Sequence, residues 1–164
     1  MLTEVDRQVQ QFTGKPVVDC AIASVGVGSW AHSVVAHYKS KSPSATVVAV
    51  EPDTAACLKT SLEAGKIVTI ETGDTIMCGM NCGTVSTIAW PALRDGVDLS
   101  LTVSDSEAHE SVKYLHDHGV QGGPCGAAPL SALRKLCQES ALRLGHESVV
   151  VLFCTEGARS YPIP

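Results

Sequence analysis

The residues best suited to chemistry form a glycine-containing segment, Ser24-Val25-Gly26-Val27-Gly28-Ser29, which lies between an apolar run and an amphipathic one. Glycine allows a tight turn and lets the backbone approach a ligand without a Cβ in the way. If a helix begins directly after the turn, its free N–H groups and its dipole converge there and favour an anion. The segment is therefore a predicted phosphate site.

The same turn also fits a second binding pattern. Gly26-x-Gly28-x-x-Ala31 matches the glycine fingerprint of dinucleotide-binding folds, and Glu51 follows the next apolar run, where such folds place a ribose-binding acid. A strand-to-helix turn that binds nothing is a third interpretation, because short glycine patterns are common in α/β proteins. The turn by itself leaves these three interpretations open.

Short apolar runs that alternate with amphipathic segments are predicted to position the turn. The predicted core strands are Val17–Ala23, Thr46–Val50, Leu99–Val103 and Val149–Cys154. Strands without polar alternation are typical of a parallel sheet that is covered by helices on both faces. Helices are expected over residues 3–13, 30–38, 53–63, 87–94, 104–118 and 127–144, a short edge strand over 67–70, and a loop over 71–86. The expected fold class is α/β, with residues 1–164 forming a single partial domain.

Ligands of parallel sheets gather where the strands end. The predicted strand ends carry Ser24–Gly28, Glu51, Ser104 and Thr155–Gly157. A second glycine-rich turn, Gln121–Gly126, precedes the longest predicted helix. The buried stripe expected on that helix consists of Leu130, Leu133, Leu136, Cys137 and Leu144.

Composition narrows the classes of partner. The chain has 164 residues, 45% of them hydrophobic and 18% charged, which is typical of a globular domain. Its net charge is −5 and it has no basic run, so nucleic acid and anionic membranes are not expected as partners. No stretch approaches the ~20 apolar residues of a membrane span. The acidic, polar N-terminus predicts no signal peptide and therefore a cytoplasmic location.

The seven cysteines suggest no disulfide framework, because their number is odd and their spacing irregular. Cys20, Cys137 and Cys154 lie in apolar runs and are predicted to be small core residues. Cys78 and Cys82 form the only close pair and could supply half of a zinc site. No second pair accompanies them, so no metal is expected.

Five motifs follow one another in an order that resembles a known family. They are the glycine turn Ser24–Ser29, the strand end Val47–Pro52, and the segments Asp74–Gly83, Gly122–Ala128 and Thr155–Gly157. Together they resemble the pyridoxal-phosphate enzymes of the tryptophan-synthase-β and threonine-dehydratase superfamily, of fold type II. The diaminopropionate ammonia-lyases are the members most resembled, and the resemblance covers essentially the whole chain.

The resemblance implies pyridoxal phosphate as the cofactor and assigns its contacts. Gly26, Val27, Gly28 and Ser29 would hold the phosphate through backbone N–H groups, and Thr155 would place a hydroxyl beside the pyridine nitrogen. A neutral hydroxyl there leaves the nitrogen mostly unprotonated, which suits α,β-elimination. The segments 74–83 and 122–126 would border the active site without an assigned role. The implied reaction releases ammonia from a small amino acid such as 2,3-diaminopropionate.

The resemblance also implies that part of the enzyme lies elsewhere. In the family, the Schiff-base lysine, the small domain and the substrate-carboxylate loop precede the segment matched here. The lysines of this chain lie in polar contexts, without the apolar flanks that lower the pKa of a catalytic lysine. The chain is therefore expected to be the C-terminal, cofactor-phosphate-binding part, with no catalytic residue and no complete activity alone. An uncovered apolar edge should favour a homo-oligomer or a partner that supplies the N-terminal half.

Overall fold

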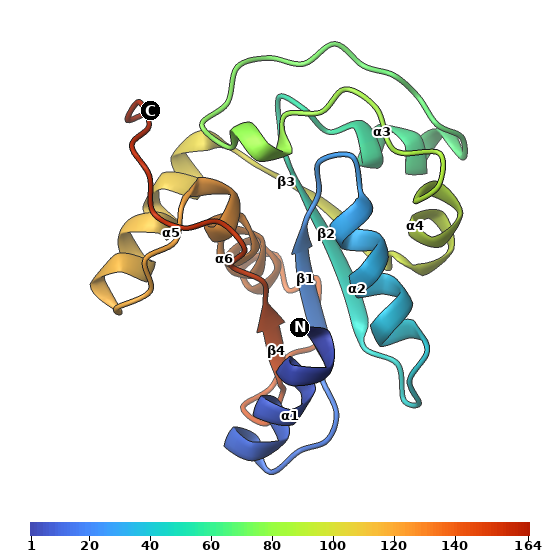
Figure 1. The fold of residues 1–164 in the computed structure, drawn as a ribbon, viewed down its shortest axis with the longest axis vertical. Coiled ribbons are helices and arrows are strands. Elements are labelled where there is room, and N and C mark those ends of the chain that lie inside the picture. Colours follow the sequence, from blue (N-terminus) through green and yellow to red (C-terminus); the bar gives the residue numbers. More distant parts are fainter.

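A four-stranded parallel sheet forms the centre of the molecule (Figure 1). The computed structural model describes all of residues 1–164. The strands are β1 (Cys20–Ser24), β2 (Thr46–Pro52), β3 (Leu99–Val103) and β4 (Val150–Leu152), in the order β3-β2-β1-β4. Every pair of neighbouring strands is parallel. The predicted α/β class and the four predicted core strands are confirmed.

One or more helices separate each strand from the next along the chain, and another helix precedes the first strand. They are α1 (Leu2–Thr13), α2 (Ser29–Lys39), α3 (Cys57–Ala64), α4 (Trp90–Gly96), α5 (Asp105–Asp117), α6 (Pro124–Gln138) and a short 3₁₀ turn, η1 (Cys78–Met80). Figure 1 shows α2, α3 and α4 on one side of the sheet and α5 and α6 on the other. Both faces of the sheet are therefore covered, as predicted.

Each face of the sheet has its own core because neighbouring side chains of a strand point to opposite faces. Ala21 and Val47 point to the face covered by α2. Ile22 and Val48 point to the opposite face, where α6 packs. No helix is both long enough and apolar enough to span a lipid bilayer.

The ends of the strands differ from their predicted positions, except in β3. β1 begins at Cys20 instead of Val17, and β2 continues past Val50 to Pro52. The predicted strand Val149–Cys154 is reduced to Val150–Leu152. Beyond it the chain leaves β1 and turns towards the start of α6, where the Glu156 carbonyl accepts a hydrogen bond from the Gly123 N–H at 3.0 Å.

The predicted edge strand Ile67–Ile70 does not form. The Val68 N–H donates to the hydroxyl of Ser61 on α3 at 3.0 Å, and the Ile70 N–H donates to the Gly83 carbonyl at 2.8 Å. These bonds tie the segment to a helix and to a loop, so no strand ladder is possible. The sheet consequently has β3 and β4 as its two edges.

Two helices begin later in the chain than predicted. α3 begins at Cys57 instead of Asp53 or Thr54, and α4 begins at Trp90 instead of Thr87. Gly65 closes α3 in the left-handed conformation, with φ of 67°, one residue beyond the helix end at Ala64.

A capping box starts α5, with Ser104 as the N-cap; the sequence alone left Ser104 and Asp105 as alternatives. The Glu107 N–H donates to the Ser104 hydroxyl at 3.2 Å. The Ser104 N–H in turn donates to the Glu107 carboxylate at 2.7 Å. Two of the N–H groups at the helix start are thereby satisfied by local side chains, which is a signal that sequence reasoning can detect.

α6 spans Pro124–Gln138, so the predicted helix Ala127–Leu144 began too late and ended too late. Its buried side is formed by Ala128, Ala132 and Leu136, with Cys137 exposed. The predicted stripe followed the leucines, whereas the small alanines face the sheet because they allow the helix to approach it closely. Leu130 and Leu133 are only half-buried, and Leu144 lies outside the helix.

The predicted core cysteines do not share one environment. Cys20 is fully buried in β1, as predicted. Cys137 and Cys154 are exposed instead, which corrects their prediction as core residues. Both follow apolar runs, but each comes after the last buried residue of its element.

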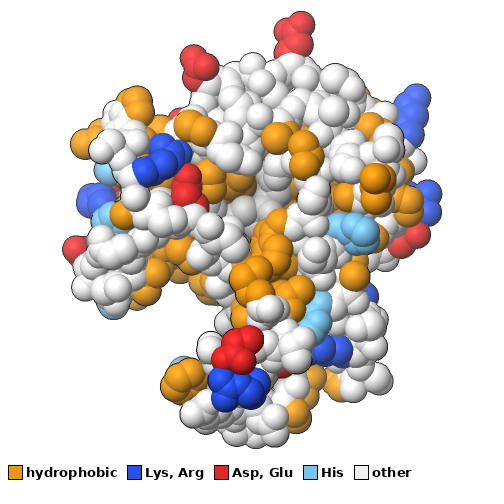
Figure 2. Space-filling model, in the orientation of Figure 1, with side chains coloured by type: hydrophobic (Ala, Val, Ile, Leu, Met, Phe, Trp, Pro, Cys, Tyr) orange, Lys and Arg blue, Asp and Glu red, His pale blue; other side chains and the backbone are white.

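Figure 2 shows hydrophobic side chains collected in the middle of one face, above α1, with charged side chains mainly towards the periphery. Trp30 and Phe153 meet edge to face in the core that α1 covers, with ring centroids 5.2 Å apart. Phe12 and Ile88 are each 82% exposed. The association of this chain with a second copy or with a partner, through uncovered apolar surface, remains a prediction.

Candidate active site at the carboxyl edge of the sheet

A pocket of about 570 Å³ lies at the carboxyl ends of β1 and β4. The two strands are parallel neighbours, with Ile22 opposite Leu152, so the residues that follow them lie at the same edge. The pocket is lined by Ser24, Gly26, Val27, Gly28, Ser29, Trp30, Gly79, Met80, Cys125, Thr155, Glu156 and Gly157. All five predicted cofactor-binding residues are thus brought together: Gly26, Val27, Gly28, Ser29 and Thr155.

The glycine turn presents unpaired backbone donors to this pocket. Gly28 is the N-cap of α2 and has a left-handed φ of 96°. The N–H groups of Gly26, Gly28 and Ser29 donate to no backbone acceptor in the chain. The first N–H groups of a helix have no partner within it, and the helix dipole places partial positive charge beside them. The turn can therefore accept an anion such as a phosphate.

Close packing explains why glycines occupy the turn. A Cβ on Gly26 would lie 2.9 Å from the carbonyl oxygen of Gly79. A Cβ on Gly28 would lie 2.6 Å from Cδ1 of Leu93 on α4. The turn is held between the η1 region and α4, so the absence of side chains serves both the fold and the approach of a ligand.

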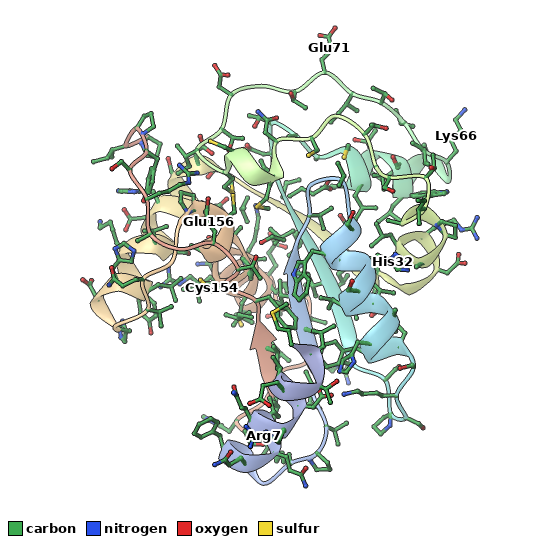
Figure 3. All side chains as sticks on the ribbon, viewed as in Figure 1. Arg7, His32, Lys66, Glu71, Cys154 and Glu156 are labelled. Carbon is green, nitrogen blue, oxygen red and sulfur yellow. The ribbon has the colours of Figure 1, made fainter.

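Glu156 is a pocket residue to which the sequence assigned no role. Its Oε2 accepts a hydrogen bond from the Cys125 N–H at 2.6 Å, and its Oε1 lies 2.7 Å from Nε of Arg159. Figure 3 shows Glu156 on the segment that follows β4, beside α6. The N-cap of α6 is Gly123, which has no side chain to offer, so Glu156 supplies the missing acceptor from a distant part of the chain.

Ser24 and Cys125 join the two sides of the pocket. The Ser24 hydroxyl, at the end of β1, donates to the Cys125 carbonyl on α6 at 2.7 Å. Burial raises the pKa of Cys125 to about 11, with the charge of Glu156 contributing to the shift. The thiol is therefore neutral near pH 7.

Glu51 has a structural position that does not suit ribose binding. It is fully buried, and its two carboxylate oxygens accept hydrogen bonds from the N–H groups of Leu58 and Lys59 at 2.7 and 2.8 Å. Burial raises its pKa to about 7. Glu51 thus caps α3 and does not line the pocket, so the dinucleotide interpretation lacks its ribose-binding acid.

The segments 74–83 and 122–126, to which the resemblance assigns no role, contribute to the wall of the pocket. Gly79 and Met80 come from the segment 74–83, and Cys125 comes from 122–126. No lysine lines the pocket. Cys78 and Cys82 belong to no group of three or more His, Cys, Asp or Glu side chains that could hold a metal ion.

A family model for "Pyridoxal-phosphate dependent enzyme" matches residues 2–155. The chain belongs to this family. The match includes the glycine turn, the motif at 74–83, the start of α6 and Thr155. The family-level expectation from the sequence is therefore confirmed.

Individual relatives within the family have different activities. The chain is 29% identical to L-threo-3-hydroxyaspartate ammonia-lyase of Pseudomonas sp, with 81% of this chain and 41% of that protein covered. It is also 29% identical to diaminopropionate ammonia-lyase of Salmonella typhimurium, with 90% and 41% covered. Serine racemases and threonine dehydratases match as well. The sequence motifs predict a closer similarity to diaminopropionate ammonia-lyases than to other members of the family. These identities do not distinguish between them.

Solved structures show the same partial correspondence. The threonine deaminase of T.th. superposes with a TM-score of 0.81 at 30% identity, and the match covers 98% of this chain and 56% of that one. The chain spans 41% of the length of the two ammonia-lyases above. It therefore corresponds to part of the proteins it resembles.

Proposed function

We propose that this chain is the cofactor-phosphate-binding part of a pyridoxal-phosphate-dependent ammonia-lyase. The complete enzyme would release ammonia from a small amino acid such as 2,3-diaminopropionate. One observation carries the proposal: the unpaired N–H groups at the start of α2 and the residue Thr155 line the same pocket. When bound, pyridoxal phosphate acts as an electron sink that stabilises negative charge at the substrate's α carbon.

The residues of this chain would bind and orient the cofactor. Gly26, Val27, Gly28 and Ser29 would hold the phosphate through backbone N–H groups at the start of α2, and the two glycines place no Cβ between the turn and the anion. Thr155 would offer a neutral hydroxyl to the pyridine nitrogen. The proposal assigns no catalytic lysine to this chain, because none lines the pocket.

Placing a negative charge at the start of α2 should weaken phosphate binding without harming the helix. Ser29 is exposed and is the first residue of α2, so Ser29→Asp places a carboxylate beside the free N–H groups. We expect the affinity for deoxypyridoxine phosphate to fall at least about fivefold, because like charges a few ångströms apart repel by about 1 kcal/mol or more. This probe lacks the aldehyde that would react with surface lysines, and its binding can be followed by calorimetry.

Ser33→Asp is the matched control for this experiment. Ser33 is also an exposed serine of α2, one helical turn further from the pocket, and it does not line it. Its substitution should lower the affinity much less than Ser29→Asp does, since its charge lies about 5.4 Å further from the free N–H groups and is exposed to water. Equal losses in both variants, or no binding by the unsubstituted chain, would count against the proposed phosphate site.

A further inference from the structure

Glu51 is a buried acid that lies behind the glycine turn, outside the pocket itself. It follows Val50 on β2, and the Val50 carbonyl accepts a hydrogen bond from the Val25 N–H in the turn at 2.9 Å. The Glu51 side chain is fully buried and forms no ion pair with a lysine, arginine or histidine. When it is ionised, its carboxylate is therefore a buried charge that only two backbone N–H groups stabilise directly.

Two thiols link Glu51 to the turn. The Cys57 thiol donates to the Gly26 carbonyl at 3.9 Å, and Sγ of Cys82 lies 3.2 Å from the position that a Cβ on Gly26 would take. Burial raises the pKa of Cys57 to about 12 and also raises the pKa of Cys82, and the charge of Glu51 contributes to both shifts. Both thiols are therefore neutral near pH 7, and both are close enough to Glu51 to respond to its charge.

The other groups that face Glu51 do not change charge near neutral pH. Lys59 on α3 supplies the one positive charge that acts on it. Thr102 lies opposite Glu51 in the register of β3 and is neutral. Glu51 is thus the member of this cluster that titrates close to neutrality, because burial raises its pKa to about 7.

We propose that Glu51 links phosphate binding at the glycine turn to the uptake of a proton: the protonated acid permits tight binding, and the ionised acid opposes it. The inference rests on the proposed function and concerns the regulation of that same site. A charge in the protein interior repels a nearby anion more strongly than a charge in water does. Ionised Glu51 also offers the Cys57 thiol a stronger acceptor than the Gly26 carbonyl, so the turn loses this contact.

The direction of the pH dependence follows from the repulsion. A bound phosphate raises the pKa of Glu51 above its value in the free chain, because two negative charges are then held close together. The affinity is therefore constant below about pH 7, where Glu51 is protonated in the free and the bound chain. It falls as the pH rises past about 7 and levels off above the pKa of the complex. We expect the total loss to be about fivefold.

Calorimetry with deoxypyridoxine phosphate at about pH 6 and about pH 8.5 tests this link. The unsubstituted chain and Glu51→Gln bind the same ligand, so the ligand's own titration cancels in the ratio of their affinities. The two affinities should be similar at the lower pH. At the higher pH, Glu51→Gln should bind about fivefold more tightly. Glu63→Gln, an exposed change at the end of α3, is the matched control and should behave as the unsubstituted chain at both pH values.

The carboxyl carbon signal of Glu51 tests the same link in the unsubstituted chain, whether or not a variant folds. Its NMR titration midpoint should rise by about 0.7 pH unit in saturating deoxypyridoxine phosphate, which corresponds to the fivefold change in affinity. Deoxypyridoxine without the phosphate should leave the midpoint where it is in the free chain. A carboxylate that only caps α3 would show no difference between the two compounds.

The outcomes separate this inference from the proposed function. If the affinity ratio of Glu51→Gln to the unsubstituted chain is the same at both pH values, or the midpoint does not rise, the inference is overturned and the proposed function stands. If Glu63→Gln gains as much affinity at the higher pH, the effect does not come from Glu51 and the inference is overturned. If the phosphate compound binds at neither pH, the proposed function fails, and the inference fails with it.

Discussion

Replacing Gly28 by alanine is expected to lower the free energy of unfolding by roughly 3 kcal/mol. Two costs combine in this prediction. Gly28 has a φ of 96°, which an L side chain rarely adopts. The added methyl group would also lie 2.6 Å from Cδ1 of Leu93, so the buried Leu93 side chain, α4 or the glycine turn must shift. Urea denaturation followed by circular dichroism measures the change.

Gly65→Ala separates the conformational cost of a left-handed φ from the packing cost of the added methyl group. Gly65 also has a left-handed φ, of 67°, but a Cβ there meets nothing within 4 Å. This variant should lose only the conformational contribution, about 1 kcal/mol. If Gly28→Ala were no more destabilising than Gly65→Ala, the close packing of the turn against α4 would be refuted.

Stability should fall as the pH rises through neutrality, because the folded state keeps Glu51 protonated. Burial raises the pKa of Glu51 from 4.5 to about 7. The folded chain therefore holds a proton between these two values that the unfolded chain has released. The stabilising contribution is complete below about pH 4.5 and is lost as the pH rises past about 7, amounting to about 3 kcal/mol.

Glu51→Gln should remove this pH dependence. Near pH 5 the protonated acid and the amide are similar, so the two proteins should have similar stability. Near pH 8 the glutamine variant should be more stable than the unsubstituted chain, because it has no buried charge to desolvate. Glu63→Gln, an exposed change at the end of α3, serves as the control and should leave the pH profile unaltered. A variant that is less stable at pH 8 would show that the bonds from the Leu58 and Lys59 N–H groups outweigh the cost of burial.

The turn and the strands were predictable because their signals are local. Glycines at positions 26 and 28 follow an apolar run and precede a helix, which is sufficient to predict a strand, a turn and an anion site. β3 was predicted with its observed bounds, Leu99–Val103, since the polar residues beside it mark both ends. The capping box at Ser104 is likewise contained within four consecutive residues.

The capping carboxylates were not predictable because they come from other parts of the chain. α3 has Ala56 as its N-cap and α6 has Gly123, and neither residue offers a side-chain acceptor. Glu51 and Glu156 supply those acceptors from the ends of other segments. A helix whose start lacks a capping side chain is the signal that could have prompted a search for a distant acid.

Chemical shifts of the backbone amides in the glycine turn test the central claim most directly. Deoxypyridoxine phosphate should shift the amide signals of Gly26, Gly28 and Ser29 in a saturable titration, since these N–H groups are unpaired in the free chain. Deoxypyridoxine without the phosphate should leave these signals nearly unchanged at the same concentrations. If the phosphate compound shifts none of the three signals, or if both compounds shift them equally, the turn is not a cofactor-phosphate site.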